Sequence, residues 1–326
     1  MVTGRRIGGI TPRALKGSVM DHVSFHNRGN TIVADVRFPE GYDASKTYPA
    51  IIVGHPISSC KEQTSGAVYG EGLTTAGYIT LAFDASHQGH SGGEPRFLED
   101  PATRVEDFRC AVDYLTTRDD VDTERIGMVG ICGGGGYSVQ AAMTDHRVKA
   151  LGTIVAANYG RLMREGNLTP TAAIDALNAI GAQRTAEARG VEPTITMYIP
   201  KSQQEREQAG IEDIDIEQAI DYYTTPRGAA DGSPNKLLFS GLAAAMAFDA
   251  FHLVDQLLTQ PLQIICGDVP GGFGSYRDAF ELFDKARSQD KNLFVIPGVS
   301  HYDLYDQPKP TGKALEQLTK FFAQYL

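Results

Sequence analysis

RIGMVGICGGGGYSVQAA, residues 125–142, joins an apolar run to four consecutive glycines and then to a helix-forming sequence. The apolar run is typical of a strand buried in a parallel sheet, and it leads directly into Gly-x-Cys-x-Gly. This is the strand–turn–helix context of a nucleophile elbow with cysteine in place of serine. Such a sharp turn strains the nucleophile and crowds its neighbours, which explains glycine two positions on either side. We therefore predict that Cys132 is a nucleophile, at a helix N-terminus that favours a thiolate.

Two other interpretations of these glycine-rich stretches stay open. Cys132 could be a small core residue, and glycine-rich turns also bind phosphates, although these glycines do not fit G-x-G-x-x-G and no Walker lysine follows. A second stretch, residues 89–93, matches G-x-S-x-G literally around Ser91. It does not follow a strand directly, and Glu-Pro-Arg stands where a helix is needed. We interpret it as a loop, with Ser91 as the alternative nucleophile.

Outside these stretches, short apolar runs alternate with helical spacing of apolar residues. An alternating pattern at 31–38, preceded by 22–25 and a turn, predicts an antiparallel hairpin. We therefore predict an α/β fold with a doubly wound, mostly parallel sheet and an N-terminal antiparallel hairpin. The apolar runs are at 50–53, 78–83, 126–129, 148–155, 262–266 and 292–296, and helical spacing occurs at 105–115 and 315–322.

The alternation of strands and helices stops between residues 158 and 260. This segment is rich in Ala, Glu and Gln, and its periodicity shows no convincing strand pair. We interpret 158–260 as a helical cap inserted into an α/β core formed by 1–157 and 261–326. A separate helical domain is the alternative, since a segment of this length could hold its own core. Helical patches lie at 171–180, 202–208, 216–223 and 241–258.

The composition of the 326 residues is that of a soluble globular protein with a formal charge of −10. We expect no nucleic-acid partner, because no basic patch is visible. We expect neither secretion nor a membrane span, because no signal-peptide pattern and no run of about 18 apolar residues occurs. The four cysteines lack paired spacing, which indicates free thiols, no metal site and a cytoplasmic location. Whether the chain forms a homodimer is left open.

A nucleophile of this kind needs a base, and in such sheets the order along the chain is nucleophile, acid, histidine. Of the eight histidines, His301 is the one that follows the last predicted strand. The acid is expected after the strand at 262–266, but Pro270 occupies the usual position. Asp268 is the nearest carboxylate, and we predict that it orients His301, with Asp278 as the alternative.

Oxyanion stabilisation in such a fold uses two backbone N–H groups. One belongs to the residue after the nucleophile, Gly133. The other comes from the loop after the strand at 50–53, where Pro56 has no N–H and Ile57 is the natural donor.

Taken together, these residues resemble the α/β-hydrolase superfamily, and within it the dienelactone-hydrolase-like group with a cysteine nucleophile. The resemblance rests on Gly-Ile-Cys-Gly-Gly at 130–134, Val-Ser-His-Tyr-Asp at 299–303, and His-Pro-Ile and Lys-Glu-Gln between 55 and 63. The longer match is similar to a branch of polyketide-processing acyl hydrolases and transferases. The missing Gly-x-x-Asp acid and the larger cap depart from dienelactone hydrolase, and the cap argues against its small cyclic substrate.

The resemblance implies acyl transfer. We expect a hydrolase that cleaves an ester, thioester or lactone of a small-molecule acyl substrate by a Cys132–His301–Asp268 acyl-enzyme mechanism, without a cofactor. Transfer of the acyl group to an alcohol is one alternative, if the cap excludes water. The other alternative is a catalytically silent binding protein of the same fold.

Overall fold

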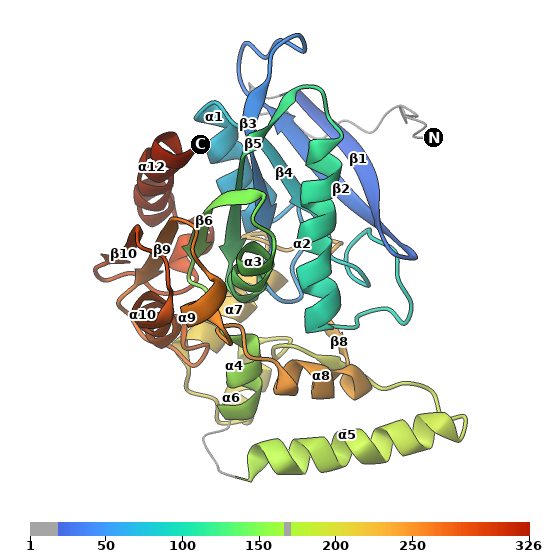
Figure 1. Cartoon of the computed structure of the whole chain (residues 1–326). Coiled ribbons are helices and arrows are strands. Elements are labelled where there is room, and N and C mark those ends of the chain that lie inside the picture. The colour runs from blue at the N-terminus through green and yellow to red at the C-terminus, as the bar shows by residue number, and fades with distance from the viewer. Residues whose placement is uncertain (1–18, 166–170) are drawn as a thin grey trace.

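The computed structural model describes residues 19–165 and 171–326, and its centre is an eight-stranded sheet with helices on both faces (Figure 1). The amino-terminal residues on which the expectation about a signal peptide rests lie outside this described part. The strands of the sheet are β1 (Val19–Asn27), β2 (Asn30–Phe38), β3 (Tyr48–Gly54), β4 (Ile79–Phe83), β5 (Val121–Ile131), β6 (Val148–Ile154), β9 (Leu262–Gly267) and β10 (Lys291–Ile296).

The strand order is β1-β2-β4-β3-β5-β6-β9-β10. Strands β1 and β2 form the predicted antiparallel hairpin, which closes at the pair Asn27 and Asn30. Strand β2 is antiparallel to β4, and every later pair in the sheet is parallel. The predicted fold class is therefore confirmed: the sheet is mostly parallel, with its antiparallel part at the amino-terminal edge.

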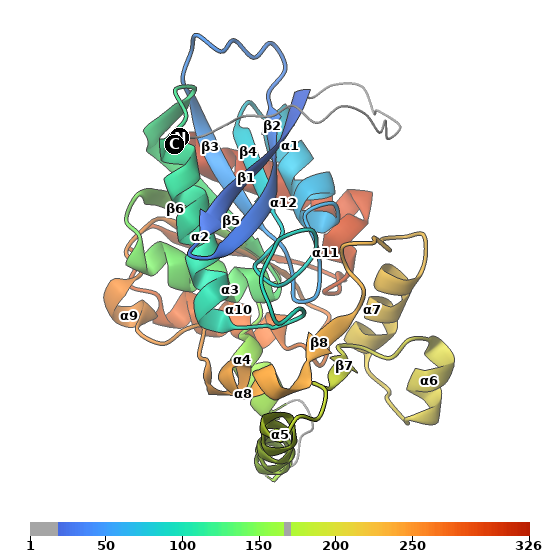
Figure 2. The same cartoon turned by 90° about the vertical axis from the view of Figure 1, so that its right-hand side faces the viewer.

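Each face of the sheet is covered by its own layer of helices (Figures 1 and 2). The first layer packs Phe108 of α2 and Tyr137 of α3 into one hydrophobic core, and the second packs Leu318 and Phe322 of α12 into the other. The first layer contains α2 (Pro101–Thr116), α3 (Gly133–Thr144), α9 (Val254–Leu257) and α10 (Ser275–Lys285); the second contains the π-helical segment η1 (Thr64–Gly70), α1 (Glu71–Thr75), α11 (Asp303–Asp306) and α12 (Pro308–Tyr325).

The segment between β6 and β9 is mainly helical, as expected, but it also contains a small antiparallel sheet. Its strands β7 (Ile195–Met197) and β8 (Lys236–Leu238) have three residues each, which is too short for an alternating pattern to reveal. The expected helix at 241–258 is interrupted and forms two short helices. The helices of the segment are α4 (Tyr159–Glu165), α5 (Ala172–Ala188), α6 (Gln203–Gln208), α7 (Ile214–Thr224), the 3₁₀ turn η2 (Phe239–Gly241), α8 (Leu242–Ala247) and α9.

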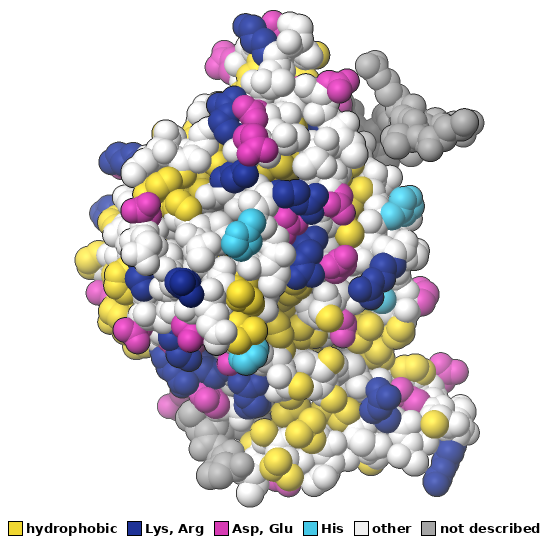
Figure 3. Space-filling view, viewed as in Figure 1, with side chains coloured by type: hydrophobic (Ala, Val, Ile, Leu, Met, Phe, Trp, Pro, Cys, Tyr) yellow, Lys and Arg dark blue, Asp and Glu magenta, His cyan; other side chains and the backbone are white. Residues whose placement is uncertain are grey.

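Helix α5 lies at the end of the molecule farthest from the sheet in both views (Figures 1 and 2). Hydrophobic side chains gather over this end of the surface (Figure 3), and Ile174 and Leu177 of α5 are exposed. Throughout residues 19–165 and 171–326, no helix combines the length and the hydropathy needed to cross a membrane.

Candidate active site

Cys132 lies at the turn between β5 and α3, where the sequence predicted it. Its backbone has φ 54° and ψ −124°, a conformation that is strained for a residue with a side chain. The strain is held by the surrounding backbone, because Cys132 N donates to Ile154 O at 3.0 Å and Cys132 O accepts from Ala157 N at 2.9 Å. The turn therefore projects the thiol from the carboxyl end of a central strand.

The glycines on either side of this turn are required by space. A Cβ on Gly130 would lie 2.2 Å from Ser138 Oγ, and one on Gly134 would lie 2.4 Å from His55 O. Because both distances are far shorter than real Cβ contacts, the close packing of β5, α3 and the loop after β3 depends on these two glycines.

The Cys132 thiol is 3% exposed and protonated at rest. Burial is the largest influence and raises its pKa to about 11, although hydrogen bonds from Tyr305 and from the backbone of Gly133 and Ile57 oppose this shift. The charge of Asp215 raises it further. The donors at the helix N-terminus thus favour the thiolate, as expected, but desolvation outweighs them.

The two predicted oxyanion donors meet at the thiol. The backbone N–H groups of Gly133 and Ile57 both lie close enough to the Cys132 sulfur to lower the pKa of its thiol. Their close approach also needs glycine at 133, because a Cβ there would lie 2.4 Å from the Ile57 side chain. Two N–H groups that converge at one sulfur can stabilise a negative oxygen formed beside it.

His301 follows β10 and is 2% exposed. Its Nδ1 lies 3.0 Å from Ser275 Oγ, and its Nε2 lies 3.3 Å from the hydroxyl of Tyr305. Burial lowers the His301 pKa to about 3, so the imidazole is neutral at neutral pH and can accept a proton. Tyr305, the neighbour of His301 Nε2, also lies close enough to Cys132 to affect the pKa of its thiol.

Neither of the two carboxylates considered as the acid that orients the histidine, Asp268 or Asp278, forms a hydrogen bond with His301 in the described part of the chain. Asp268 is exposed and accepts a hydrogen bond from Gly298 N at 2.6 Å. Asp278 is fully buried in an ion pair, with both of its oxygens 2.7 Å from Arg161 nitrogens. Among residues 19–165 and 171–326, Ser275 rather than a carboxylate is the hydrogen-bond partner of His301 Nδ1.

Sequence reasoning missed Asp215 at the start of α7. Its Oδ2 accepts from Phe273 N at 2.9 Å, while its Oδ1 is buried without a partner. Burial raises the Asp215 pKa to about 7. Phe273 packs edge-on against the His301 ring, with centroids 5.4 Å apart, so α7 is linked to the base through this loop. No sequence motif marks the connection.

Two tyrosine hydroxyls near Cys132, those of Tyr159 and Tyr198, are also buried without partners. Burial raises the pKa of each, and the neighbouring Cys132 thiolate would raise it further. Such hydroxyls remain protonated and can donate to a ligand.

Ser91 has a structural hydrogen-bonding pattern. Its hydroxyl donates to Asp84 O at 2.6 Å and accepts from Val33 N at 2.8 Å. The Ser91 hydroxyl is therefore occupied by two hydrogen bonds to backbone, one to β2 and one to the residue that follows β4.

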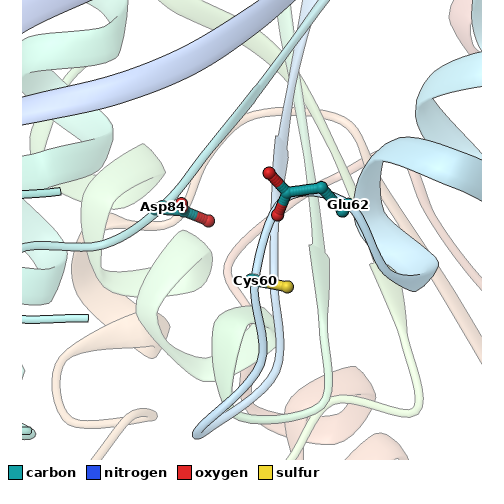
Figure 4. A group of neighbouring side chains, drawn as sticks. All are labelled: Cys60, Glu62 and Asp84. Carbon is teal, nitrogen blue, oxygen red and sulfur yellow. The ribbon is translucent and has the colours of Figure 1, made fainter. Parts of the chain in front are cut away.

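Cys60, Glu62 and Asp84 form the one cluster within the described residues that has metal-ligand geometry (Figure 4). The Lys61 ammonium already lies among the carboxylates, paired with Glu62 and 3.9 Å from Asp84 Oδ2. Burial also raises the pKa of the Cys60 thiol, which disfavours the thiolate that a metal would need. The Lys61 ammonium therefore already supplies the positive charge that these carboxylates would otherwise take from a metal ion.

Comparisons with known proteins identify relatives of this chain. The model of the family described as X-Pro dipeptidyl-peptidase (S15 family) matches residues 28–230. The chain is 38% identical to the uncharacterized protein YcjY of Escherichia coli (strain K12), over 93% of this chain and 98% of that protein. It is 28% identical to the thiohydrolase apmlB of Arthrinium phaeospermum, over 56% of this chain and 60% of that protein.

Solved structures show the same architecture. The crystal structure of the hypothetical protein PA2218 from Pseudomonas aeruginosa is 30% identical and covers 96% of this chain and 95% of its own, with a TM-score of 0.87. The α/β hydrolase GrgF from Penicillium sp. sh18 is 19% identical, over 94% and 99%, with a TM-score of 0.75. The protein is therefore an α/β hydrolase, and its chain belongs to the X-Pro dipeptidyl-peptidase (S15) family.

Proposed function

We propose that this protein hydrolyses an ester or thioester through an acyl-enzyme on Cys132, with His301 as the base. The observation that carries the proposal is the convergence of the Gly133 and Ile57 N–H groups on the Cys132 thiol. A carbonyl carbon attacked by this sulfur has its oxygen beside both donors, which stabilise the charge of the tetrahedral intermediate.

Because the site is buried, the proton moves from Cys132 to His301 during attack, and no thiolate–imidazolium ion pair exists before substrate binds. Burial raises the Cys132 pKa to about 11 and lowers the His301 pKa to about 3, so both side chains are neutral before substrate binds. His301 then takes the thiol proton as the sulfur attacks, and returns it to the leaving group as the intermediate collapses. Ser275, in place of Asp268, fixes the orientation of the imidazole.

An ester or thioester suits this site better than a peptide. A thiolate is a better leaving group than an amine, so a tetrahedral intermediate formed from an amide tends to expel Cys132 rather than the amine. The likeness to a protein named as a thiohydrolase supports the same choice. A lactone is cleaved by the same chemistry.

Residues of the 158–260 segment would bind the substrate as a cap. The unpartnered hydroxyl of Tyr198 and the free oxygen of Asp215 come from this segment, and Tyr159, with a second such hydroxyl, stands at its start. Buried polar atoms without partners are costly, and a bound substrate with polar atoms of its own would satisfy them.

Acyl transfer to an alcohol is a second candidate. Cys132 and His301 are 3% and 2% exposed, so little water reaches the acyl-enzyme. An alcohol bound beside it would then compete with water.

The test is turnover of p-nitrophenyl esters and acyl thioesters, with an alanine-proline p-nitroanilide as the peptide probe. We expect ester and thioester cleavage, and an acyl adduct on the Cys132 peptide in mass spectra. Cys132→Ala should abolish turnover, whereas Cys110→Ala, which changes a half-buried cysteine of α2, should retain it. Full activity in Cys132→Ala, or cleavage of the peptide probe alone, would contradict the proposal. Added alcohols that form new esters would favour transfer.

A further inference from the structure

One loop of the segment between β6 and β9 contacts the backbone beside both the oxyanion donor and the base. This α7–β8 loop, residues 225–235, joins α7 to β8. The side chain of Ser233 donates to Ser58 O at 2.5 Å, and the side chain of Arg227 donates to Tyr302 O at 3.0 Å. Ser58 directly follows the proposed oxyanion donor, and Tyr302 directly follows the proposed base. The α7–β8 loop therefore holds the chain one residue after each of these groups.

The contact with Ser58 restrains a strained part of the backbone. Ser58 has φ 55°, in the left-handed region, and a residue with a side chain keeps this conformation only when its surroundings hold it. The buried hydroxyl of Ser233 is one restraint. Gln63 is another, because its amide nitrogen donates to Gly228 O at 2.5 Å while its Oε1 accepts from Ser59 Oγ at 2.6 Å. The residues after the oxyanion donor are thus fixed to the α7–β8 loop at two points.

The oxyanion donor itself lies against the nucleophile turn. A Cβ on Gly133, the residue after Cys132, would lie 3.6 Å from Ile57 N and 2.4 Å from the Ile57 side chain. If Ser58 left the left-handed region, its direct neighbour Ile57 would move with it. An N–H group that is displaced from the developing oxyanion stabilises its charge less well.

The contact with Tyr302 is held at two further points. The Arg227 guanidinium forms two hydrogen bonds of 2.8 Å with the Asp306 carboxylate of α11, in addition to its bond to Tyr302 O. A planar guanidinium bound to both oxygens of a carboxylate is fixed in orientation as well as in distance. The backbone that carries His301 is therefore tied to the α7–β8 loop, while Ser275 holds the imidazole ring.

We propose that Ser233 and Arg227 are positioning residues, Ser233 for the Ile57 N–H and Arg227 for His301, an inference that rests on the proposed function. Both contacts come from one loop of the segment that would cover the substrate. The oxyanion donor and the base are therefore placed together with that cover. Since each contact acts on a different group, the loss of one should change the chemistry differently from the loss of the other.

Two reactions of Cys132 distinguish the two contacts. Thioester turnover needs both the oxyanion donor and the base, whereas alkylation by iodoacetamide needs only removal of the thiol proton, because it forms no oxyanion. We expect Ser233→Ala to lower kcat roughly tenfold and to leave KM and the alkylation rate of Cys132 unchanged. We expect Arg227→Met to lower both kcat and the alkylation rate. Mass spectrometry of the Cys132 peptide follows alkylation.

The matched controls remove the same side-chain groups from contacts that stay within the segment between β6 and β9. Ser202→Ala removes a hydroxyl that accepts from Glu205 N at 3.2 Å, and Arg206→Met removes a guanidinium that donates to Ile211 O at 2.7 Å. Both control variants should keep the kcat and the alkylation rate of the wild type. In case Ser233→Ala folds poorly, Gln63→Met breaks the second contact of the same loop and should likewise lower kcat alone.

An unchanged kcat in Ser233→Ala, or the same loss in Ser202→Ala, would overturn the role of Ser233. An unchanged alkylation rate in Arg227→Met, or the same loss in Arg206→Met, would overturn the role of Arg227. Failure of the proposed function looks different: it is turnover that survives Cys132→Ala.

Discussion

Ser275 Oγ lies 3.0 Å from His301 Nδ1, where a nucleophile–histidine–acid arrangement would place its carboxylate. A hydroxyl can fix the tautomer and orientation of the imidazole, but it cannot offset the charge of the imidazolium. A thiol nucleophile tolerates this weaker partner because it ionises more readily than a hydroxyl.

Ser275→Ala should therefore lower kcat/KM by about three- to tenfold, the worth of one ordinary hydrogen bond. The control is Asp268→Asn, which alters an exposed carboxylate bonded to Gly298 N and should change kcat/KM by less than about twofold. Steady-state kinetics on the best thioester measures both. The opposite pattern, a large loss in Asp268→Asn alone, would return the orienting role to that carboxylate.

The buried pair of Arg161 and Asp278 should be important for stability. Arg161→Met leaves the Asp278 carboxylate buried without its partner, and we expect the free energy of unfolding to fall by about 3–5 kcal/mol. Arg277→Met is the matched control, since Arg277 pairs with Glu165 at 2.7 Å on the surface, where such a pair is worth less than about 1 kcal/mol. Urea unfolding of the two variants measures the difference, and equal losses would contradict the prediction.

Asp215 should make stability depend on pH. Its folded pKa is about 7, against an ordinary value of 3.8, so the folded state binds more protons than the unfolded state between these values. The free energy of unfolding therefore falls as pH rises through this range, by at most about 4 kcal/mol for a shift of this size.

Asp215→Asn removes the titration and keeps an oxygen for Phe273 N. It should be more stable than wild type at pH 8 by a clearly larger margin than at pH 5. Urea unfolding at the two pH values measures this, and stability curves that stay parallel would show that Asp215 has an ordinary pKa in the folded protein.

Lys61 should be needed for the loop that carries Ile57. Its ammonium is 5% exposed, pairs with Glu62, and lies 3.8 Å from Asp35 Oδ2 and 3.9 Å from Asp84 Oδ2. Lys61→Met removes the buried ammonium and leaves only the partly charged His22 and His90 beside these carboxylates, and we expect a loss of about 3 kcal/mol or more in stability.

The control for this variant is Lys320→Met on the surface of α12, where both partners of the ion pair are 67% exposed. Thermal unfolding should show a large decrease in Tm for Lys61→Met and almost none for the control. Similar Tm values would mean that the buried carboxylates do not depend on Lys61.

The sequence by itself determined where the eight strands of the main sheet lie along the chain, the antiparallel hairpin and the turn at Cys132. These features depend on neighbouring residues: apolar runs mark buried strands, and glycine at 130 and 134 marks a turn without room for side chains. It also indicated His301, because the histidine follows the last strand directly.

Only the tertiary structure decided what surrounds these residues. Ser275 reaches His301 across 26 positions of sequence, and Arg161 reaches Asp278 across 117. The pKa of Cys132 also depends on tertiary structure, because burial by distant segments raises it more than the donors at the helix N-terminus lower it. Hydrogen-bond partners and desolvation are set by which segments pack together, and no pattern among adjacent residues records them.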